Sequence, residues 1–223
     1  MRKVFYKRVE EITGDVLTMA NLAREAVTGA VKSLINADYD LARKVIDGDN
    51  KIDEYEISIE EKCVTLQAEY QPLAKDLRYI HSVSNIIIQL ERIGDLSVNI
   101  AKVTRRLSKM NIKYLDEDLK KLLQEMLNLS VSILDKASRA FKESNPGLAS
   151  RMTRIDDDID NIEKAIVRKL YSFSPGKEEN MKIIANISLV ARYLERIGDH
   201  SVNIGERAQY YLTGDYTIFH SDT

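Results

Sequence analysis

The stretch LERIGDLSVNI, residues 90–100, returns almost unchanged as LERIGDHSVNI at residues 194–204. Ten of the eleven residues agree across an offset of 104 positions, and the exception is Leu96 against His200. Leucine and isoleucine recur in this word every three or four residues, which is typical of one buried face of a helix. Two acids and an asparagine occupy other positions of the same helix, and packing alone does not explain their repetition. The word therefore predicts a helical fold and a duplicated site.

The duplication extends over most of the chain. At an offset of 107 residues, DNKIDEYE (49–56) aligns with DDDIDNIE (156–163). The offset falls to 104 at the repeated word, so one loop is three residues shorter in the second half. Self-similarity of this kind indicates a tandem of one structural unit. We place the two units at residues 1–111 and 112–223.

Each unit reads as three helices. The chain has nine glycines, three prolines and no tryptophan, which favours long helices over many short strands. Asp38 and Asp116 stand where N-caps are expected, Pro146 stands just inside a helix start, and Gly48 is expected to kink its helix. We predict an all-α protein of two three-helix bundles packed side by side, followed by a poorly ordered tail after Gly214. The six predicted helices cover residues 6–36, 39–69, 72–110, 116–144, 147–173 and 178–212.

The charge balance, the cysteine content and the lengths of the apolar runs indicate which classes of protein can be excluded. Lys and Arg number 33 against 35 Asp and Glu, so the sequence shows no basic footprint for nucleic acid. The single Cys63 excludes an internal disulfide, and its spacing from Ile59 and Leu66 indicates a core position. No apolar run approaches the roughly 18 residues of a membrane span, and no signal peptide is evident. We expect a cytoplasmic protein, at most peripheral to a membrane complex.

The acids of the repeated word lie on a different face from its apolar stripe. On a helical wheel the leucine and isoleucines cluster on one side, whereas Glu91, Asp95 and Asn99 follow at i, i+4 and i+8 along the flank or outer face. Gly94 lies between the two faces, where a missing side chain lets another helix approach closely. The second copy repeats this arrangement with Glu195, Asp199 and Asn203.

The middle helix of each unit carries acids as well. Asp49, Asp53, Glu56 and Glu60 fall within about 60° of one another on the wheel, beside the apolar stripe. Carboxylates at i and i+4 lie roughly 6 Å apart and repel by a few tenths of a kcal/mol per pair, so a repeated acidic stripe needs an explanation. The second unit repeats the stripe with Asp156, Asp160 and Glu163, and has Val167 in place of the fourth acid.

Two interpretations of these acids stay open. The first is a solvated face whose charge Arg92 and Arg196 offset. The second is a binding site for a hard cation, since oxygen ligands suit Mg²⁺, Mn²⁺ or iron, with zinc as a further candidate. We favour the cation, because the acids recur in register while ordinary surface positions have drifted between the halves, as from Arg24 to Val131. Acids from two helices could share bridging carboxylates in a multinuclear site.

Other reactive motifs are scarce. The histidines are His81, His200 and His220, and none forms the Glu-x-x-His pair of interior di-iron bundles. The sequence has no Gly-rich phosphate loop, nucleophile elbow or paired-cysteine motif. We interpret His200 as a surface residue or a neighbour of the ligands. Arg78 near a helix start suits either an anion or a capping contact.

The paired E-x-x-x-D words, Glu91–Asp95 and Glu195–Asp199, resemble the signature of the PhoU family. The segment QPLAKDLRYI (71–80), the two D-x-x-I-D-x-x-E segments and the ending YLTGD (211–215) are similar to that family too. The resemblance covers essentially the whole chain. It implies two three-helix bundles that present metal clusters on the protein surface.

The resemblance also implies a set of metal ligands. Carboxylates from the two outer words would hold the ions, carboxylates from the middle helices would complete each cluster, and the asparagines would ligate or orient them. The expected cofactors are divalent or trivalent ions of iron, manganese, magnesium or zinc. The implied ligands are Glu91, Asp95, Glu195 and Asp199, completed by Asp53, Glu56, Asp160 and Glu163, with Asn99 and Asn203 beside them.

For function, the resemblance implies a negative regulator of phosphate uptake and of phosphate-regulon signalling. Such a protein is an adaptor between the phosphate ABC transporter, through its ATPase subunit, and a sensor histidine kinase. Two alternatives stay open, a carboxylate-bridged metalloenzyme and a metal-free helical scaffold. An enzyme needs an open coordination position in a pocket that excludes water, and the wheel places the acids outside the core, so we predict no enzyme. We keep a homodimer as a hypothesis.

Overall fold

The computed structural model describes residues 2–109, 115–143, 152–173 and 178–215. Every regular element in these ranges is a helix, which confirms the all-α prediction. No helix in the described ranges is long and apolar enough to cross a membrane. The predicted unit boundary at 111–112, the helix start at Pro146 and the tail from residue 216 lie outside them. The helices are α1 (Arg2–Asn36), α2 (Tyr39–Gly48), α3 (Asn50–Tyr70), α4 (Lys75–Lys109), α5 (Glu117–Glu143), α6 (Met152–Tyr171) and α7 (Glu178–Thr213).

Local sequence explains where several helices begin. The Asp38 Oδ1 atom accepts the backbone N–H of Leu41 at 2.9 Å and caps α2. Asp116 caps α5 by accepting the backbone N–H groups of Asp118 and Leu119 at 2.9 and 3.3 Å. A side-chain oxygen in this position satisfies a backbone donor that has no partner within the helix. Both caps confirm the sequence-based predictions.

The helix predicted over residues 39–69 is divided into α2 and α3 at Asp49, immediately after Gly48. Asp49 keeps helical dihedrals, with φ −61° and ψ −39°, so the division is a local kink and not a loop. This confirms the expected loosening at Gly48. The helix predicted from residue 72 begins at Lys75, because Gln71 and Ala74 have positive φ values of 45° and 49° that a helix does not accommodate.

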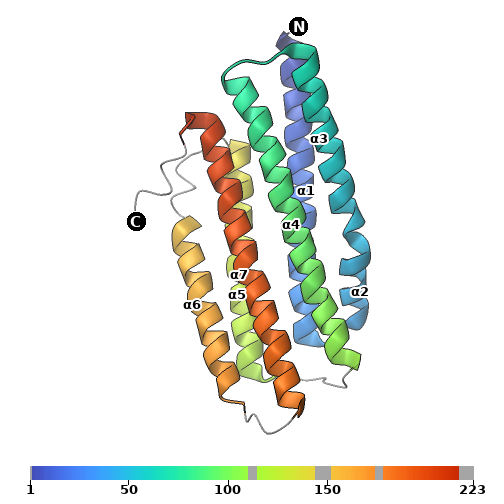
Figure 1. Ribbon diagram of the computed structural model, residues 1–223, viewed down its shortest axis with the longest axis vertical. Helices are drawn as coiled ribbons and strands as arrows, with labels where there is room; N and C mark the ends of the chain where they lie inside the picture. The colour runs from blue at the N-terminus through green and yellow to red at the C-terminus, as the bar shows by residue number, and fades with distance from the viewer. Residues whose placement is uncertain (1, 110–114, 144–151, 174–177, 216–223) are drawn as a thin grey trace.

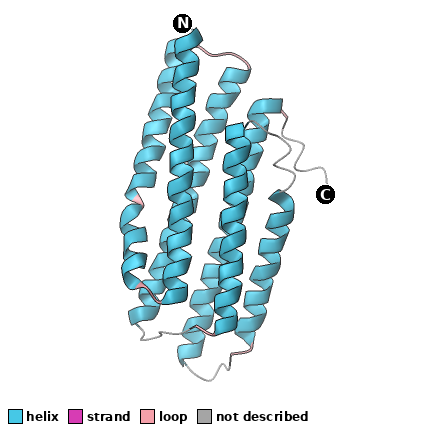
Figure 2. Cartoon of the chain, turned by 180° about the vertical axis from the view of Figure 1, so that it is seen from behind, coloured by secondary structure: helices cyan, strands magenta, loops and turns pink. Residues whose placement is uncertain are grey.

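The two units pack side by side along four long helices. The helix α4 contacts α1 and α7, and α5 contacts the same two helices, so these four form the centre of the molecule (Figure 1). The helices α2 and α3 lie beside α1 and α4, and α6 lies beside α5 and α7. In Figure 1 α4 and α7 lie in front of α1 and α5, and Figure 2 shows the molecule from behind. One face of the molecule is therefore built by α3, α4, α7 and α6.

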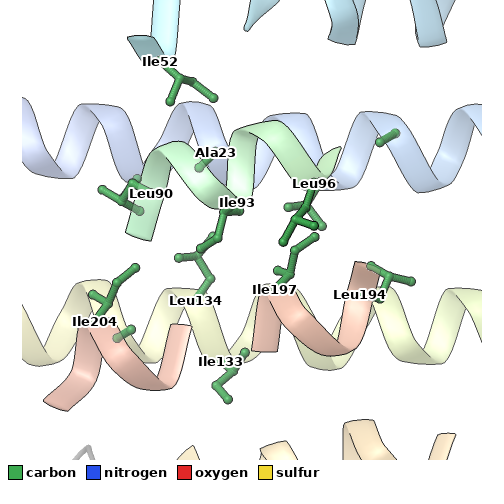
Figure 3. Close-up of a cluster of buried hydrophobic side chains, with 14 of the residues drawn as sticks. Ala23, Ile52, Leu90, Ile93, Leu96, Ile133, Leu134, Leu194, Ile197 and Ile204 are labelled. Carbon is green, nitrogen blue, oxygen red and sulfur yellow. The ribbon is translucent and has the colours of Figure 1, made fainter. Parts of the chain in front are cut away.

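The apolar core is continuous between the units. Ile93 of α4 points toward Leu134 of α5, and Leu96 of α4 points toward Ile197 of α7 (Figure 3). These four side chains are at most 5% exposed. Cys63 is 1% exposed and belongs to the same core, as its spacing predicts. The two units therefore share one continuous hydrophobic core.

A cluster of three aromatic rings closes the boundary near one end of the molecule. Tyr79 of α4, Phe141 of α5 and Tyr211 of α7 have ring centroids 5.7 to 6.0 Å apart. The Tyr79 hydroxyl reaches α1, where it lies 2.7 Å from the Thr13 Oγ1 atom and donates to the Val9 carbonyl at 3.1 Å. Burial of these rings joins all four central helices.

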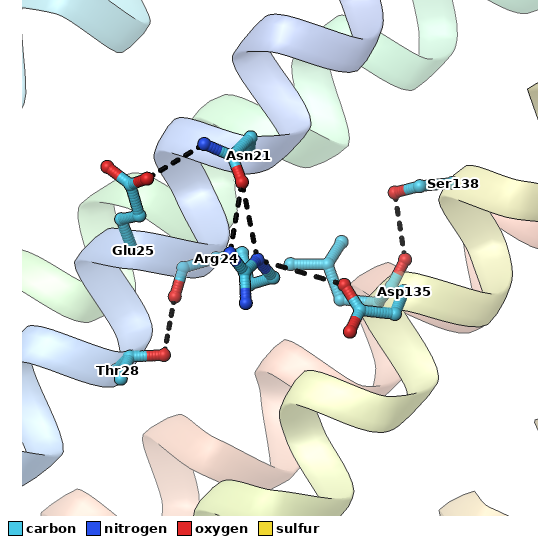
Figure 4. Close-up of polar contacts among 7 residues, drawn as sticks. Asn21, Arg24, Glu25, Thr28, Asp135 and Ser138 are labelled. Atoms are coloured by element: carbon cyan, nitrogen blue, oxygen red, sulfur yellow. Dashed lines mark hydrogen bonds and ion pairs between the residues drawn. The ribbon is translucent and has the colours of Figure 1, made fainter.

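A line of polar contacts, here called the polar seam, joins α1 to α5 on the face opposite to the one that α4 and α7 build. Arg24 of α1 lies 3.9 Å from the Asp135 carboxylate of α5, and its guanidinium also donates to the Asn21 side chain at 3.1 Å (Figure 4). The Asn21 amide in turn donates to Glu25 at 2.8 Å. Exposed ion pairs contribute about 0–1 kcal/mol, so this seam adds little to the stability of the contact between the units.

Candidate metal centre

The fold brings the acids of α3 and α4 together on the exposed face of the first unit. We call Asp49, Asp53, Glu56, Glu91 and Asp95 the first acidic cluster. Glu56 and Glu91 are half-buried and Asp95 is exposed, so these carboxylates line the flank of α4 as the helical wheel predicts. Burial raises the pKa values of Asp49, Glu56 and Glu91, and the charges of Asp53 and Asp95, one from each helix, raise them further.

Gly94 fixes how α3 crosses α4 at this cluster. A Cβ atom built on Gly94 would come within 3.0 Å of both the Asp49 Oδ1 atom and the Ile52 Cδ1 atom. The absent side chain therefore makes room for a carboxylate and for the first core residue of α3. This confirms the close helix approach expected at Gly94, and it identifies Asp49 as the acid that meets the glycine.

The second unit repeats the arrangement. We call Asp156, Asp160, Glu163, Glu195 and Asp199 the second acidic cluster, which lies between α6 and α7. A Cβ atom on Gly198 would lie 3.1 Å from both the Asp156 Oδ1 atom and the Ile159 Cδ1 atom. The same word thus produces the same contact twice.

Burial and mutual repulsion make the carboxylates of the first cluster hard to ionise. Burial, reinforced by Asp95, raises the pKa of Glu91 to about 7. Burial also raises the pKa of Asp49 to about 6, with Asp53 and Asp95 adding to the rise and Lys102 opposing it. A nearby like charge disfavours the ionised form, and so does loss of solvent.

The second cluster behaves in the same way. Burial and the charge of Asp199 raise the pKa values of Asp156 and Glu195 to about 6. The Glu195 Oε1 atom accepts from Arg192 at 2.6 Å, whereas its Oε2 atom is buried without a hydrogen-bond partner. A buried carboxylate oxygen without a donor is unfavourable, and a bound cation would relieve it.

His200 and Asn203 of the second repeated word contact Gln89 of α4, outside the second acidic cluster. The His200 Nδ1 atom lies 2.8 Å from the Gln89 Oε1 atom of the other unit, and Asn203 Nδ2 donates to the same oxygen at 3.3 Å. The half-buried His200 therefore lies beside the cluster, facing α4. Asn99, the first-unit counterpart of Asn203, is half-buried on the same face of α4 as its acids.

The side chains, as they are placed, do not form a finished coordination sphere. Within the described residues, no three Asp, Glu, His or Cys side chains converge closely enough to hold a metal ion. The donor set nevertheless fits a hard cation, since it consists of oxygen atoms, its carboxylates repel one another, and Glu195 leaves a buried oxygen unsatisfied. The ligand assignments stay a prediction.

Asp49 and Asp156 are the residues that sequence reasoning did not include among the ligands. Both were placed on the acidic faces of the middle helices, and their signal was the aligned aspartate that opens DNKIDEYE and DDDIDNIE. Only the crossing of the helices shows that each one meets the glycine of the repeated word. Arg78, which the sequence suits to either an anion or a capping contact, lies against Gly214 at the end of α7, with its Nε atom buried and unpartnered.

Sequence comparison matches this chain to one family along most of its length. The sequence model of the PhoU domain matches it twice, at residues 16–104 and 123–208. The phosphate-specific transport system accessory protein PhoU homolog 1 of Thermotoga maritima is 37% identical over 210 residues, covering 94% of this chain and 89% of the relative. The phosphate-specific transport system accessory protein PhoU of Escherichia coli is 31% identical over 210 residues, covering 94% and 86%.

Solved structures agree with the fold. The crystal structure of PhoU from Pseudomonas aeruginosa superposes with a TM-score of 0.87 at 31% sequence identity, covering 95% of this chain and all of that one. The structure of the phosphate transport system regulatory protein PhoU from Streptococcus pneumoniae gives a TM-score of 0.84 at 27% identity, with 95% and 98% coverage. Both match across the two units.

Proposed function

Since the chain belongs to the PhoU family, we propose that it is an accessory protein of phosphate transport that acts as a metal-binding negative regulator. The support for phosphate transport is the set of relatives, which are named as accessory proteins of the phosphate-specific transport system and match over nearly the full chain. The observation that supports metal binding is the duplicated contact between a glycine and an aspartate within each acidic cluster.

The metal would be held by the two acidic clusters. Glu91 and Asp95 face the acids of α3, and Glu195 and Asp199 face those of α6. A bound cation would neutralise carboxylates that now repel one another and would tie each middle helix to its neighbour. The protein itself contributes the helix crossing, the oxygen donors and the flanking arginines.

We propose an adaptor and not an enzyme. The acids lie along the exposed face of a helical layer, where a cation would shape a surface that partners recognise. The expected partners are the ATPase subunit of a phosphate ABC transporter and a phosphate sensor histidine kinase, and the expected location is the cytoplasm. A homodimer is compatible with this role. A carboxylate-bridged hydrolase is the alternative, and turnover of phosphate esters that disappears in the Asp95→Ala/Asp199→Ala variant would favour it.

Metal binding is tested by elemental analysis of protein purified without chelator. We expect stoichiometric metal in the parent chain and a large loss in the Asp95→Ala/Asp199→Ala variant. The matched control is Glu54→Ala/Asp158→Ala, which removes one exposed acid from each of α3 and α6 outside the clusters. Metal retained in full by the Asp95→Ala/Asp199→Ala variant would exclude these ligands.

The regulatory role is tested in a deletion strain grown with abundant phosphate. We expect phosphate-regulon genes to be expressed there although phosphate is plentiful, and repression to return with the parent gene. Continued repression in the deletion strain would contradict a negative regulator, whatever the metal analysis gives.

A further inference from the structure

The C-terminal end of α4 carries a groove whose described lining residues are all cations. Lys102, Arg105, Arg106 and Lys109 line an open groove of about 270 Å³, which we call the α4 basic groove. Three other grooves lined by described residues also contain lysine or arginine, but each includes a carboxylate, such as Asp135 in the groove between α1 and α5. Within the described residues, none of the four cations of the α4 basic groove forms an ion pair.

The internal repeat shows that the fold does not require these charges. At the offset of 104 residues that aligns the repeated words, the four cations fall on Glu206, Gln209, Tyr210 and Thr213. Cations near a helix C-terminus are favoured by the helix dipole, but α7 has no basic residue in its last turn and is as long as α4. The dipole acts within the last turn, so it favours Arg106 and Lys109 but does not account for Lys102 and Arg105.

Part of the groove is held in place by the other unit. The Arg106 Nη1 atom donates to Asn186 Oδ1 of α7 at 3.0 Å. Asn186 is only 5% exposed, and its own amide donates to the Lys182 carbonyl at 2.8 Å. A guanidinium oriented by a buried neutral group keeps its full charge for an external anion, and it loses less conformational entropy on binding than a free side chain.

The shape of the groove favours an extended anion. The four cations occupy positions i, i+3, i+4 and i+7 of one helix, which spread them over about 10 Å. A single oxyanion cannot contact all of them. No described residue that lines the groove is aromatic, so these residues offer no stacking platform for a nucleobase.

Exposed apolar side chains lie on the facing helix. Met181 and Leu189 of α7 are 52% and 40% exposed. The Arg106–Asn186 and Gln89–His200 contacts set an antiparallel register that places Leu189 level with Lys102. An exposed apolar side chain level with the cations suits a protein surface better than a bare polyphosphate chain, because protein interfaces combine an apolar core with a polar rim.

We propose that the α4 basic groove is the docking surface for an acidic amphipathic helix of a partner protein. That helix presents Asp or Glu at i, i+3 or i+4, and i+7 to the cations, and an apolar residue to Leu189. The proposal rests on the proposed adaptor role, and it identifies the face that an adaptor uses. Because the contact is largely electrostatic and exposed, it is sensitive to salt.

The probe is a fluorescently labelled 21-residue alanine-rich helical peptide with Glu at i, i+3, i+4 and i+7 and one leucine on the same face. Binding to the full chain is measured by anisotropy at 50 and 500 mM salt. We expect binding at low salt that falls at least tenfold at high salt, and no comparable binding of the same peptide with Gln in place of Glu. Charge reversal in Lys102→Glu/Arg106→Glu should weaken binding at least tenfold.

The control Lys32→Glu/Lys121→Glu changes the same net charge at exposed cations elsewhere and should stay within twofold of the parent. If the reversal variant loses helicity, Lys102→Gln/Arg106→Gln replaces it, with an expected loss of threefold or more. Equal binding by the parent and the groove variants overturns the proposal. So does displacement of the peptide by micromolar tripolyphosphate, or tighter binding to phosphatidylglycerol vesicles than to the peptide, since either assigns the groove to phosphate groups.

This experiment is separate from the test of the regulatory role. Metal content and the deletion-strain phenotype report on the proposed function, and neither requires the groove. If the chain binds the peptide through the groove but its deletion leaves repression intact, the docking surface stands and the role in phosphate regulation is excluded. If deletion abolishes repression but the peptide does not bind through the groove, the role in phosphate regulation stands and the docking surface is excluded.

Discussion

Asp49 lies over Gly94 so closely that a methyl group at the glycine would come within 3.0 Å of the carboxylate oxygen. The same relationship recurs between Asp156 and Gly198 at 3.1 Å. The glycine of the repeated word thus admits an acid from the neighbouring helix to a position beside Asp95 or Asp199. Packing and charge meet at this crossing, which explains why glycine and acids recur together.

Replacement of Gly94 by alanine should reveal this crossing. Alanine in a helix interior is better than glycine by roughly 1 kcal/mol, but overpacking against Asp49 and Ile52 costs about 1–3 kcal/mol. We expect the variant to be no more stable than the parent in urea denaturation and to bind less metal. Gly14→Ala is the control, because nothing lies within 4 Å of a Cβ atom there, and it should gain up to about 1 kcal/mol. Equal gains for both variants would contradict the steric role of Gly94.

The metal-free protein should become less stable as pH rises from about 4 to 7. Burial and neighbouring acids raise the folded-state pKa values of Glu91 to about 7 and of Asp49 to about 6, whereas the unfolded chain titrates near its ordinary values. The folded state therefore binds more protons in this window, and that stabilisation is lost as pH rises through the folded pKa values. Thermal melting after chelation measures the effect.

The carboxylates responsible for this pH dependence can be removed in pairs. Asp49→Asn/Asp156→Asn should flatten the pH profile and raise the melting temperature at pH 8, because amides do not repel Asp95 and Asp199. Burial, with Arg196, lowers the pKa of His200, so this residue opposes the trend, whereas Asp116 and Glu178 have lowered pKa values and titrate below the window. A metal-free parent that is most stable at pH 8 would show that the clusters are not strained by their charge.

The sequence predicted the helices well where periodicity and caps agree. Asp38 and Asp116 cap their helices as expected, and Gly48 marks the kink between α2 and α3. The predicted start of α4 was three residues too early. The positive φ values at Gln71 and Ala74 depend on how the chain turns and leave no periodic signal in the sequence.

The acidic faces were also predictable, because the face on which a residue lies follows from spacing along one helix. The sequence did not predict which acids of different helices meet, because that depends on where one helix crosses another. Asp49 reaches Gly94 only through the approach of α3 to α4, and the contact of His200 with Gln89 joins residues 111 positions apart. Single-helix reasoning therefore identifies candidate ligands but not their grouping.

The shared core predicts that the two units unfold together. Phe141 of α5 is 3% exposed, stacks on Tyr79 and meets the Tyr211 ring edge to face, so Phe141→Ala should cost about 3–5 kcal/mol. Because these rings join both units, circular dichroism and tyrosine fluorescence should report one coincident, shifted transition. Two separate transitions, with only the second unit destabilised, would show that the units are independent.

The contact of Gln89 with α7 should make the two clusters unequal. Its Oε1 atom lies 2.8 Å from His200 Nδ1 and accepts from Asn203 Nδ2 at 3.3 Å, whereas Tyr193 and Leu96 occupy the equivalent positions of Gln89 and His200 in the repeat. Gln89→Leu leaves two half-buried polar groups without this partner, so we expect a loss of about 1–2 kcal/mol in urea denaturation.

The same variant should affect metal at the second cluster more than at the first, because Asn203 and Asp199 share a face of α7. Metal content is measured in Gln89→Leu combined with Asp95→Ala, and separately with Asp199→Ala, so that one cluster is left in each protein. The decrease should be larger where only the second cluster remains. Tyr193→Phe at the equivalent position is the control and should leave both values near those of the parent. Equal decreases in the two backgrounds would mean that Gln89 supports the fold alone and does not position the second cluster.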